Sequence, residues 1–174
     1  FWLFQPYQRE RIFTFLAPER DPLGSGYNVT QSIIAIGAGQ WIGRGLSRGS
    51  QSQLHFLPEA QTDFIFAVIA EELGFVGVTV LLGLYALLLY RLLIIAERAS
   101  GDFAAAVVIG IALLFFWQLF LNVGAAVGLI PITGVTLPFL SYGGSSLLIN
   151  LSLIGIAESV ASGGTLRTNS ELLG

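Results

Sequence analysis

The chain has 174 residues, of which 54% are hydrophobic and 11% are charged, and its net charge is −3. Soluble domains carry about 25% charged residues, so this composition indicates an integral membrane protein. The absence of cysteine excludes disulfides and thiol chemistry. A single histidine argues against a zinc site, and the lack of a basic run argues against nucleic acid as a partner.

Residues 1–72 are mostly too polar to cross a bilayer. We expect 1–4 to be the tail of a span whose front is absent, because the chain starts at phenylalanine and has no methionine, as in the back part of a longer protein. Residues 5–16 interleave charges with aromatic side chains, which is typical of a helix in the membrane interface. Residues 29–42 are apolar but too short for a span, and they predict a re-entrant or interfacial helix.

Two arginines follow in a glycine-rich segment. Arg44 and Arg48 are flanked by glycines, which let backbone approach a ligand closely, and a guanidinium is suited to clamp a phosphate. Snorkelling to lipid headgroups explains the pattern equally well, and the residues alone leave both interpretations open. A dinucleotide-binding fingerprint is excluded, because Ile42 stands where its third glycine is required.

The segment that follows places carboxylates at the start of a long apolar run. Pro58 suits the first turn of a helix, which predicts that Glu59 and Asp63, four residues apart, share a helix face, with Thr62 beside them. A carboxylate at a membrane–water boundary is a candidate functional group because it is costly to keep there. The alternative is that Asp63 only caps or solvates the helix start.

Three complete spans are predicted at about 73–95, 103–124 and 144–162. From Phe103 to Ala157 no residue is charged, and this stretch is far too long for one span of roughly 20 residues. Glycines and prolines gather between residues 124 and 146, so the break between two spans is expected there.

The number of spans fixes which loops share a side of the membrane. Loop 5–72 and loop 125–143 lie on one side, and the turn 91–102 and the C-terminal tail on the other. The turn and the tail contain arginine, whereas loop 125–143 contains neither lysine nor arginine. The positive-inside rule therefore predicts that the turn and tail are cytoplasmic and that both loops are extracytoplasmic.

The loop before the last span ends in hydroxyls and glycines. Exposed N–H groups and the dipole at a helix N-terminus form an anion site, which makes Ser141, Gly143, Gly144 and Ser145 candidate substrate-binding residues. The alternative is a serine cap with close glycine packing between spans. Irregular backbone at membrane depth is unfavourable without a compensating role, which favours function for the loop as a whole.

These segments together resemble the C-terminal part of a SEDS protein, the shape, elongation, division and sporulation family that contains RodA, FtsW and SpoVE. Four blocks carry the resemblance, in order: DPLGSGYNVTQSIIAIG at 21–37, FLPEAQTDFIFA at 56–67, EELGF at 71–75 and PITGVTLPFLSYGGSS at 131–146. The segment Gln51–Leu54 and the Asp21–Pro22 turn resemble RodA more than FtsW. Gln40 and Gln61 depart from the family, which often has glycine and histidine there.

The resemblance implies an all-α integral membrane fold, the C-terminal part of a multi-span helical bundle with a large extracytoplasmic loop, in the bacterial cytoplasmic membrane. It also implies a peptidoglycan glycosyltransferase that polymerises lipid II for cell-wall synthesis, cell elongation and rod shape, or for septal division. Such enzymes work with a class B penicillin-binding protein transpeptidase.

The family's essential aspartate falls on Asp63, which would act as the catalytic base, with Glu59 and Thr62 as neighbouring substrate contacts. Arg44, Arg48 and the 141–146 turn would face the lipid pyrophosphate. A divalent cation is the substitute for this positive charge, and no other cofactor is expected. Two other functions stay open: a lipid II flippase, and a non-catalytic membrane scaffold for the penicillin-binding protein.

Overall fold

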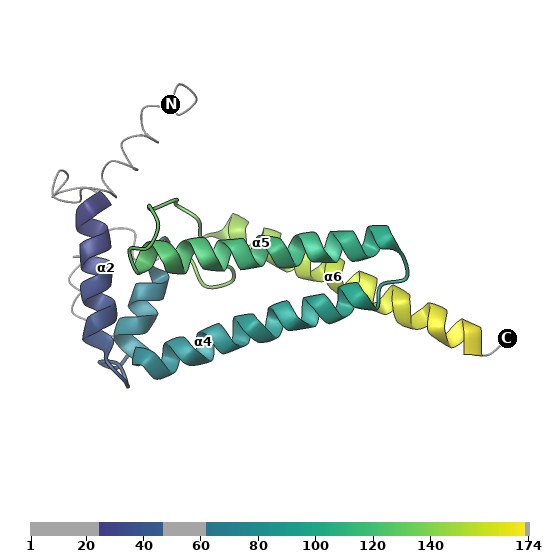
Figure 1. Cartoon of the computed structure of the whole chain (residues 1–174), viewed down its shortest axis with the longest axis horizontal. Helices are drawn as coiled ribbons and strands as arrows, with labels where there is room; N and C mark the ends of the chain where they lie inside the picture. The colour runs from purple at the N-terminus through teal and green to yellow at the C-terminus, as the bar shows by residue number, and fades with distance from the viewer. Residues whose placement is uncertain (1–24, 47–61, 173–174) are drawn as a thin grey trace, which may run out of the picture.

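The computed structural model describes residues 25–46 and 62–172, and every regular element within these ranges is an α-helix (Figure 1). The helices are α2 (Ser25–Gly39), α4 (Ile65–Glu97), α5 (Asp102–Ala126) and α6 (Gly144–Leu172). Three of them, α4, α5 and the Gly144–Gly163 part of α6, are long and apolar enough to cross a membrane. The prediction of an all-α membrane fold is therefore confirmed.

Helices α4, α5 and α6 form the body of the molecule. Their hydropathy is high on all sides, as expected for helices that meet lipid as well as one another. In the most apolar window of α4 only 11% of the residues are buried, so most of this helix is left for lipid or for further protein. The buried residues that join the three helices are Leu92, Ala96, Val108, Ile111, Ala112, Phe115 and Ala157.

Helix α2 lies across the end of this body at which α5 ends and α4 begins (Figure 1). Ser32 on α2 is fully buried and donates a hydrogen bond of 2.7 Å to the carbonyl of Ala126, the last residue of α5. A second apolar cluster forms where α2, the start of α4 and the end of α5 meet. Its buried members are Ala35, Phe64, Phe66, Ala67 and Ala126.

Helix α4 is broken near its start, at Gly74, whose φ of 66° and ψ of −163° are not helical. A break of this kind leaves carbonyls before it and N–H groups after it without partners in the helix. The segment after α2 supplies those partners through four backbone hydrogen bonds. Donor first, they are Phe75–Gln40 at 2.8 Å, Val76–Trp41 at 3.1 Å, Arg44–Glu71 at 3.0 Å and Gly45–Glu72 at 3.0 Å.

Glycines make this close approach of two backbones possible. A Cβ on Gly39 would lie 1.8 Å from the carbonyl oxygen of Ala70, and a Cβ on Gly74 would lie 2.3 Å from the backbone nitrogen of Gly43. Both contacts are far below van der Waals separation. We call residues 40–45 together with 71–76 the splice, because one segment completes the broken hydrogen bonding of the other.

The segment between α5 and α6 turns back into the body rather than staying at its end. Leu137 is fully buried, and the Phe139 ring packs against Phe115 of α5 with centroids 5.4 Å apart. The Tyr85 hydroxyl of α4 donates to the carbonyl of Pro138. Non-helical backbone is tolerated at such depth only where protein covers it, and here α4 and α5 provide that cover.

Candidate active site

Asp63 lies in a turn immediately before α4, and its side chain is half-buried. The next residue, Phe64, is only 1% exposed and fixes this turn in the cluster between α2 and α5. On the other side Gly134 approaches the carboxylate, since a Cβ placed on Gly134 would lie 3.8 Å from Asp63 Oδ2. Gly134 has a φ of 70°, which favours glycine. The carboxylate therefore faces the segment between α5 and α6, residues 127–143, which we call the re-entrant segment.

The prediction that a helix begun by Pro58 carries Asp63 is wrong at Asp63. Helix α4 begins at Ile65, and the N–H of Ala67 donates to Phe64 at 2.9 Å rather than to Asp63. The carbonyl of Asp63 instead accepts a hydrogen bond from the side chain of Asn122, at 3.0 Å. A tertiary contact has taken the carbonyl that a longer helix would have used. Pro58 lies outside the described residues.

Asn122, one turn before the end of α5, joins the two halves of the site. Its Nδ2 donates to the carbonyl of Asp63 at 3.0 Å and to that of Val135 at 2.9 Å. The side chain is 2% exposed. The turn before α4 and the re-entrant segment are therefore held to one buried amide from a third element.

Ser141 makes a second connection between the same two segments. Its Oγ donates to the carbonyl of Thr62 at 2.6 Å and accepts from the N–H of Leu137 at 2.8 Å. Thr62 and Ser141, both predicted to bind substrate, are thus in contact beside Asp63. The Ser141 hydroxyl therefore holds the turn before α4 to the re-entrant segment. A direct contact of Ser141 with substrate stays a prediction.

The N-terminus of α6 follows Ser141 directly, so it lies close to the same turn. Gly144 and Ser145 are exposed and Gly143 is half-buried, and a Cβ on Gly144 would meet nothing within 4 Å. The hydroxyl of Ser146 lies 3.2 Å from that of Thr136, which ties this helix start to the re-entrant segment. The exposed N–H groups at the start of α6 can bind an anion. The anion would then lie near the Asp63 carboxylate but not in contact with it.

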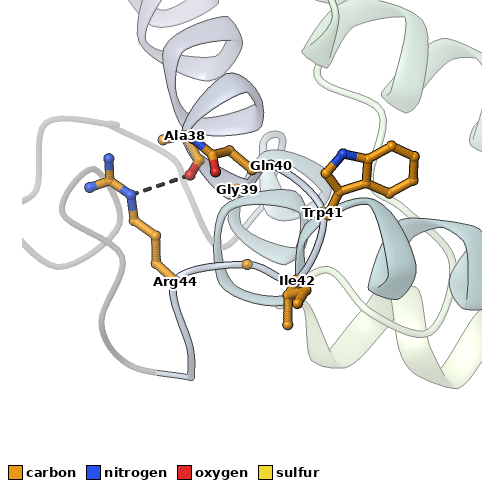
Figure 2. A pocket seen from close by; sticks show the side chains of 7 residues that line it. Ala38, Gly39, Gln40, Trp41, Ile42 and Arg44 are labelled. Carbon is orange, nitrogen blue, oxygen red and sulfur yellow. Dashed lines mark hydrogen bonds between the residues drawn. The ribbon is translucent and has the colours of Figure 1, made fainter.

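Arg44 lies at the other end of the first part of α4. Its backbone N–H donates to the carbonyl of Glu71 at 3.0 Å, and Glu71 lies roughly 9 Å along the helix from its first residue, Ile65. Its Nε donates to the carbonyl of Ala38 at 3.3 Å, beside a hollow of about 330 Å³ lined by residues 38–44 (Figure 2). The Arg44 and Trp41 side chains leave this loop in opposite directions (Figure 2).

The remaining predicted contacts, Arg48 and Glu59, lie outside the described residues. Within the described part of the chain, no three His, Cys, Asp or Glu side chains gather as metal ligands would. The structure therefore brings together Thr62, Asp63 and the start of α6, and places Arg44 apart from them.

Two features were not expected from the sequence. Asn122 was hidden in an uncharged span, where an amide side chain is the only signal that a tertiary hydrogen bond is needed. The break at Gly74 was hidden because its partners lie in a different segment, and a single glycine in an apolar helix is common.

An all-helical body with three apolar spans, a broken helix and a re-entrant segment beside a carboxylate defines a multi-pass membrane protein. The family model described as "Cell cycle protein" (FtsW/RodA/SpoVE) matches residues 1–165. The chain belongs to this family.

Similar proteins include peptidoglycan glycosyltransferase MrdB of Escherichia coli K12, which is 51% identical over 92% of this chain and 43% of its own length. Stage V sporulation protein E of Bacillus subtilis is 46% identical over 91% of this chain and 43% of its own length. The chain thus spans less than half the length of these curated relatives.

Two solved structures are similar as well. One is described as showing the coordination of polymerization and crosslinking by a peptidoglycan synthase complex. It matches 92% of this chain and 43% of its own with a TM-score of 0.72 and 39% identity. An aspartate-to-alanine mutant of the rod shape determining protein RodA from Thermus thermophilus matches 57% of this chain and 33% of its own, with a TM-score of 0.54 and 45% identity.

Proposed function

We propose that the protein containing this chain is a peptidoglycan glycosyltransferase that polymerises lipid II, with Asp63 as the catalytic base. The observation that carries the proposal is the placement of Asp63. Its carboxylate faces the re-entrant segment at one end of the membrane body, with the open start of α6 close by. The names and the identity of the relatives support the reaction class.

The reaction requires a base for the acceptor hydroxyl and groups that stabilise the charge of the leaving pyrophosphate. A base must accept the proton of the acceptor sugar hydroxyl while its oxygen forms a bond to the anomeric carbon of the donor. The bond from that carbon to the lipid pyrophosphate breaks, and the pyrophosphate leaves with the electron pair. Asp63 serves as the base, and the N–H groups at the start of α6, with Ser145, stabilise the charge on the leaving group.

We further propose that the spans lie in the bacterial cytoplasmic membrane, with Asp63 on the outer side, and that a class B penicillin-binding protein is the partner. The positive-inside rule supports this orientation. The similarity to a complex that polymerises and crosslinks supports the kind of partner. Elongation of a rod-shaped cell is the favoured setting, given the identity to MrdB and the structural likeness to RodA.

The test is polymerisation of purified lipid II by the full-length protein with its partner. Asp63→Asn keeps the shape of the side chain but removes the basic oxygen, so strand synthesis should fall by at least the ~10²–10⁴-fold expected for a lost general base. Membrane insertion and partner binding should be retained. A variant that polymerises at a near-normal rate would refute this role for Asp63, and a loss of lipid II flipping in the same variant would support a transporter.

A further inference from the structure

The buried amide of Asn122 is placed to control the orientation of the turn that carries Asp63. An asparagine side chain has two N–H donors on one nitrogen. Both point at backbone carbonyls here, of Asp63 at 3.0 Å and of Val135 at 2.9 Å. These two carbonyls belong to segments that are far apart in sequence, and neither acceptor is part of a helix.

The neighbouring peptide is held at the same time. The carbonyl of Thr62 accepts from Ser141 at 2.6 Å, so two consecutive carbonyls, of residues 62 and 63, are fixed by side chains from α5 and from the re-entrant segment. Fixing consecutive peptide planes fixes the direction of the Cα–Cβ bond between them. The direction of that bond determines where the carboxylate of Asp63 points.

The chemistry of the contact calls for an amide in particular. Asparagine donates to both carbonyls, whereas aspartate at the same place would turn acceptor oxygens toward acceptors. A leucine would leave both carbonyls without this donor. The Oδ1 atom of Asn122 is buried and accepts no hydrogen bond within the described residues. An unsatisfied buried acceptor is destabilising, so the presence of asparagine is better explained by its two donors than by overall stability.

We propose that Asn122 is a positioning residue for the reaction, acting through Asp63 without touching substrate. The inference rests on the proposed function of Asp63. A base displaced by about 1 Å can lose on the order of 10²-fold in rate. Loss of the Asn122 donors should therefore lower kcat by on the order of 10²-fold and leave KM nearly unchanged, because Asn122 bonds neither Arg44 nor the start of α6, the proposed contacts of the lipid pyrophosphate.

The experiment compares Asn122→Asp with Gln118→Leu in the full-length protein, assayed for lipid II polymerisation. Gln118 is the matched control, because it lies one turn earlier on α5, is half-buried and also has a buried oxygen with no hydrogen bond in the described structure. We expect a loss of kcat for Asn122→Asp and none for Gln118→Leu. Asn122→Ser retains one donor and is expected to show a smaller loss of kcat. It replaces Asn122→Asp in the comparison if the aspartate variant does not fold.

A double variant separates positioning from a general loss of structure. If Asn122 acts through Asp63, adding Asn122→Asp to Asp63→Asn should cause no further loss of rate, because the two changes remove the same contribution. Independent effects would multiply. A multiplied loss, an effect on KM alone or an unchanged kcat would each overturn the inference.

Hydrogen exchange tests the contact without reference to the reaction. In Asn122→Asp the amides of residues 62–66 and 134–137 should exchange faster, while those of the middle of α4 should not change. Unchanged exchange in both segments would overturn the inference whatever the activity. Faster exchange together with full activity in Asp63→Asn would instead show that the proposed role of Asp63 has failed while the contact is real.

Discussion

Asp63 and Arg44 are held at opposite ends of the first helical part of α4, residues 65–73. The backbone N–H of Arg44 donates to the carbonyl of Glu71, roughly 9 Å along α4 from its first residue, Ile65. The Arg44 guanidinium bonds the carbonyl of Ala38, and we expect it to contribute to binding of a lipid-linked phosphate, with bond making at the reacting carbon left to Asp63. The sequence is equally compatible with phosphate binding by Arg44 and with snorkelling to lipid headgroups. If Arg44 binds phosphate, we expect it to affect substrate binding rather than the chemical step.

We therefore expect Arg44→Ala to raise KM for lipid II by roughly 10- to 100-fold, the scale of a charge-assisted contact worth ~1.5–3 kcal/mol, with little effect on kcat. Arg44→Lys should recover part of the loss. Arg98→Ala is the control, because Arg98 is an exposed arginine directly after α4. An unchanged KM in Arg44→Ala would assign the side chain to lipid headgroups.

Ser141, a candidate substrate contact from the sequence, makes two hydrogen bonds within the protein. Its hydroxyl donates to Thr62 and accepts from Leu137, so its donor is already used within the protein. The serine after Gly144 differs, because Ser145 is exposed. A contact with an anion at this helix start therefore falls more naturally to Ser145 and to the backbone N–H groups.

The splice is the feature of α4 that composition could not reveal. Hydropathy measures a local transfer free energy, and it located three apolar spans because each is long and uncharged. The break at Gly74 depends on residues 40–45, a separate segment that supplies its hydrogen bonds. Gln40 within that segment has a φ of 47°, a value that favours glycine.

Gly74→Ala should strongly destabilise the fold. Its backbone conformation is nearly restricted to glycine and costs other residues about 1–3 kcal/mol, and the new Cβ would lie 2.3 Å from the backbone nitrogen of Gly43. We expect a loss of at least about 3 kcal/mol from these effects combined, measured as a lower thermal midpoint of the full-length protein in detergent.

Gly83→Ala is the matched control in the same helix. A Cβ on Gly83 would meet nothing within 4 Å, and alanine is favoured over glycine in a helix by about 1 kcal/mol. This variant should therefore melt at or above the wild-type temperature. Equal melting of the two variants would mean that the splice is not rigid.

The whole molecule has one end that collects its functional features. α2 and the start of α4 lie where α5 ends (Figure 1), and hydrogen bonds to Asp63 and Thr62 join this end to the re-entrant segment. The splice lies at the other end of the first part of α4. Trp41 and Ile42 are 72% and 83% exposed there, and the Trp41 ring meets the exposed Phe75 of α4 with centroids 5.2 Å apart. Exposed aromatic side chains beside an apolar span are typical of a membrane–water interface.

The sequence predicts which loops share this end of the molecule but not the contacts between them. The parity of the spans places loop 125–143 and Asp63 on one side, whatever the details of packing. The pairings of Asn122 with Asp63 and of Ser141 with Thr62 join residues from different elements. Such tertiary hydrogen bonds leave no periodic signal in the sequence, so the sequence alone predicts helix through the turn before α4.

The orientation of this end is testable with single cysteines, since the chain has none of its own. Thr133 is exposed in the re-entrant segment and Ser100 is exposed in the turn between α4 and α5. In the full-length protein, with cysteines elsewhere replaced, Thr133→Cys should react with an impermeant maleimide added outside the cytoplasmic membrane. Ser100→Cys should react only after permeabilisation, because the positive-inside rule applied to Arg98 and to Arg91 near the end of α4 predicts a cytoplasmic turn.

The Thr133 label also reports the side on which Asp63 lies. Asn122 ties Asp63 to Val135 through two hydrogen bonds, and Gly134 faces the Asp63 carboxylate. Residues 133–135 and the carboxylate must therefore share one side of the membrane. Labelling of Ser100→Cys but not Thr133→Cys from outside would put Asp63 on the cytoplasmic side, and polymerisation of lipid II at the outer surface would then be untenable for this site.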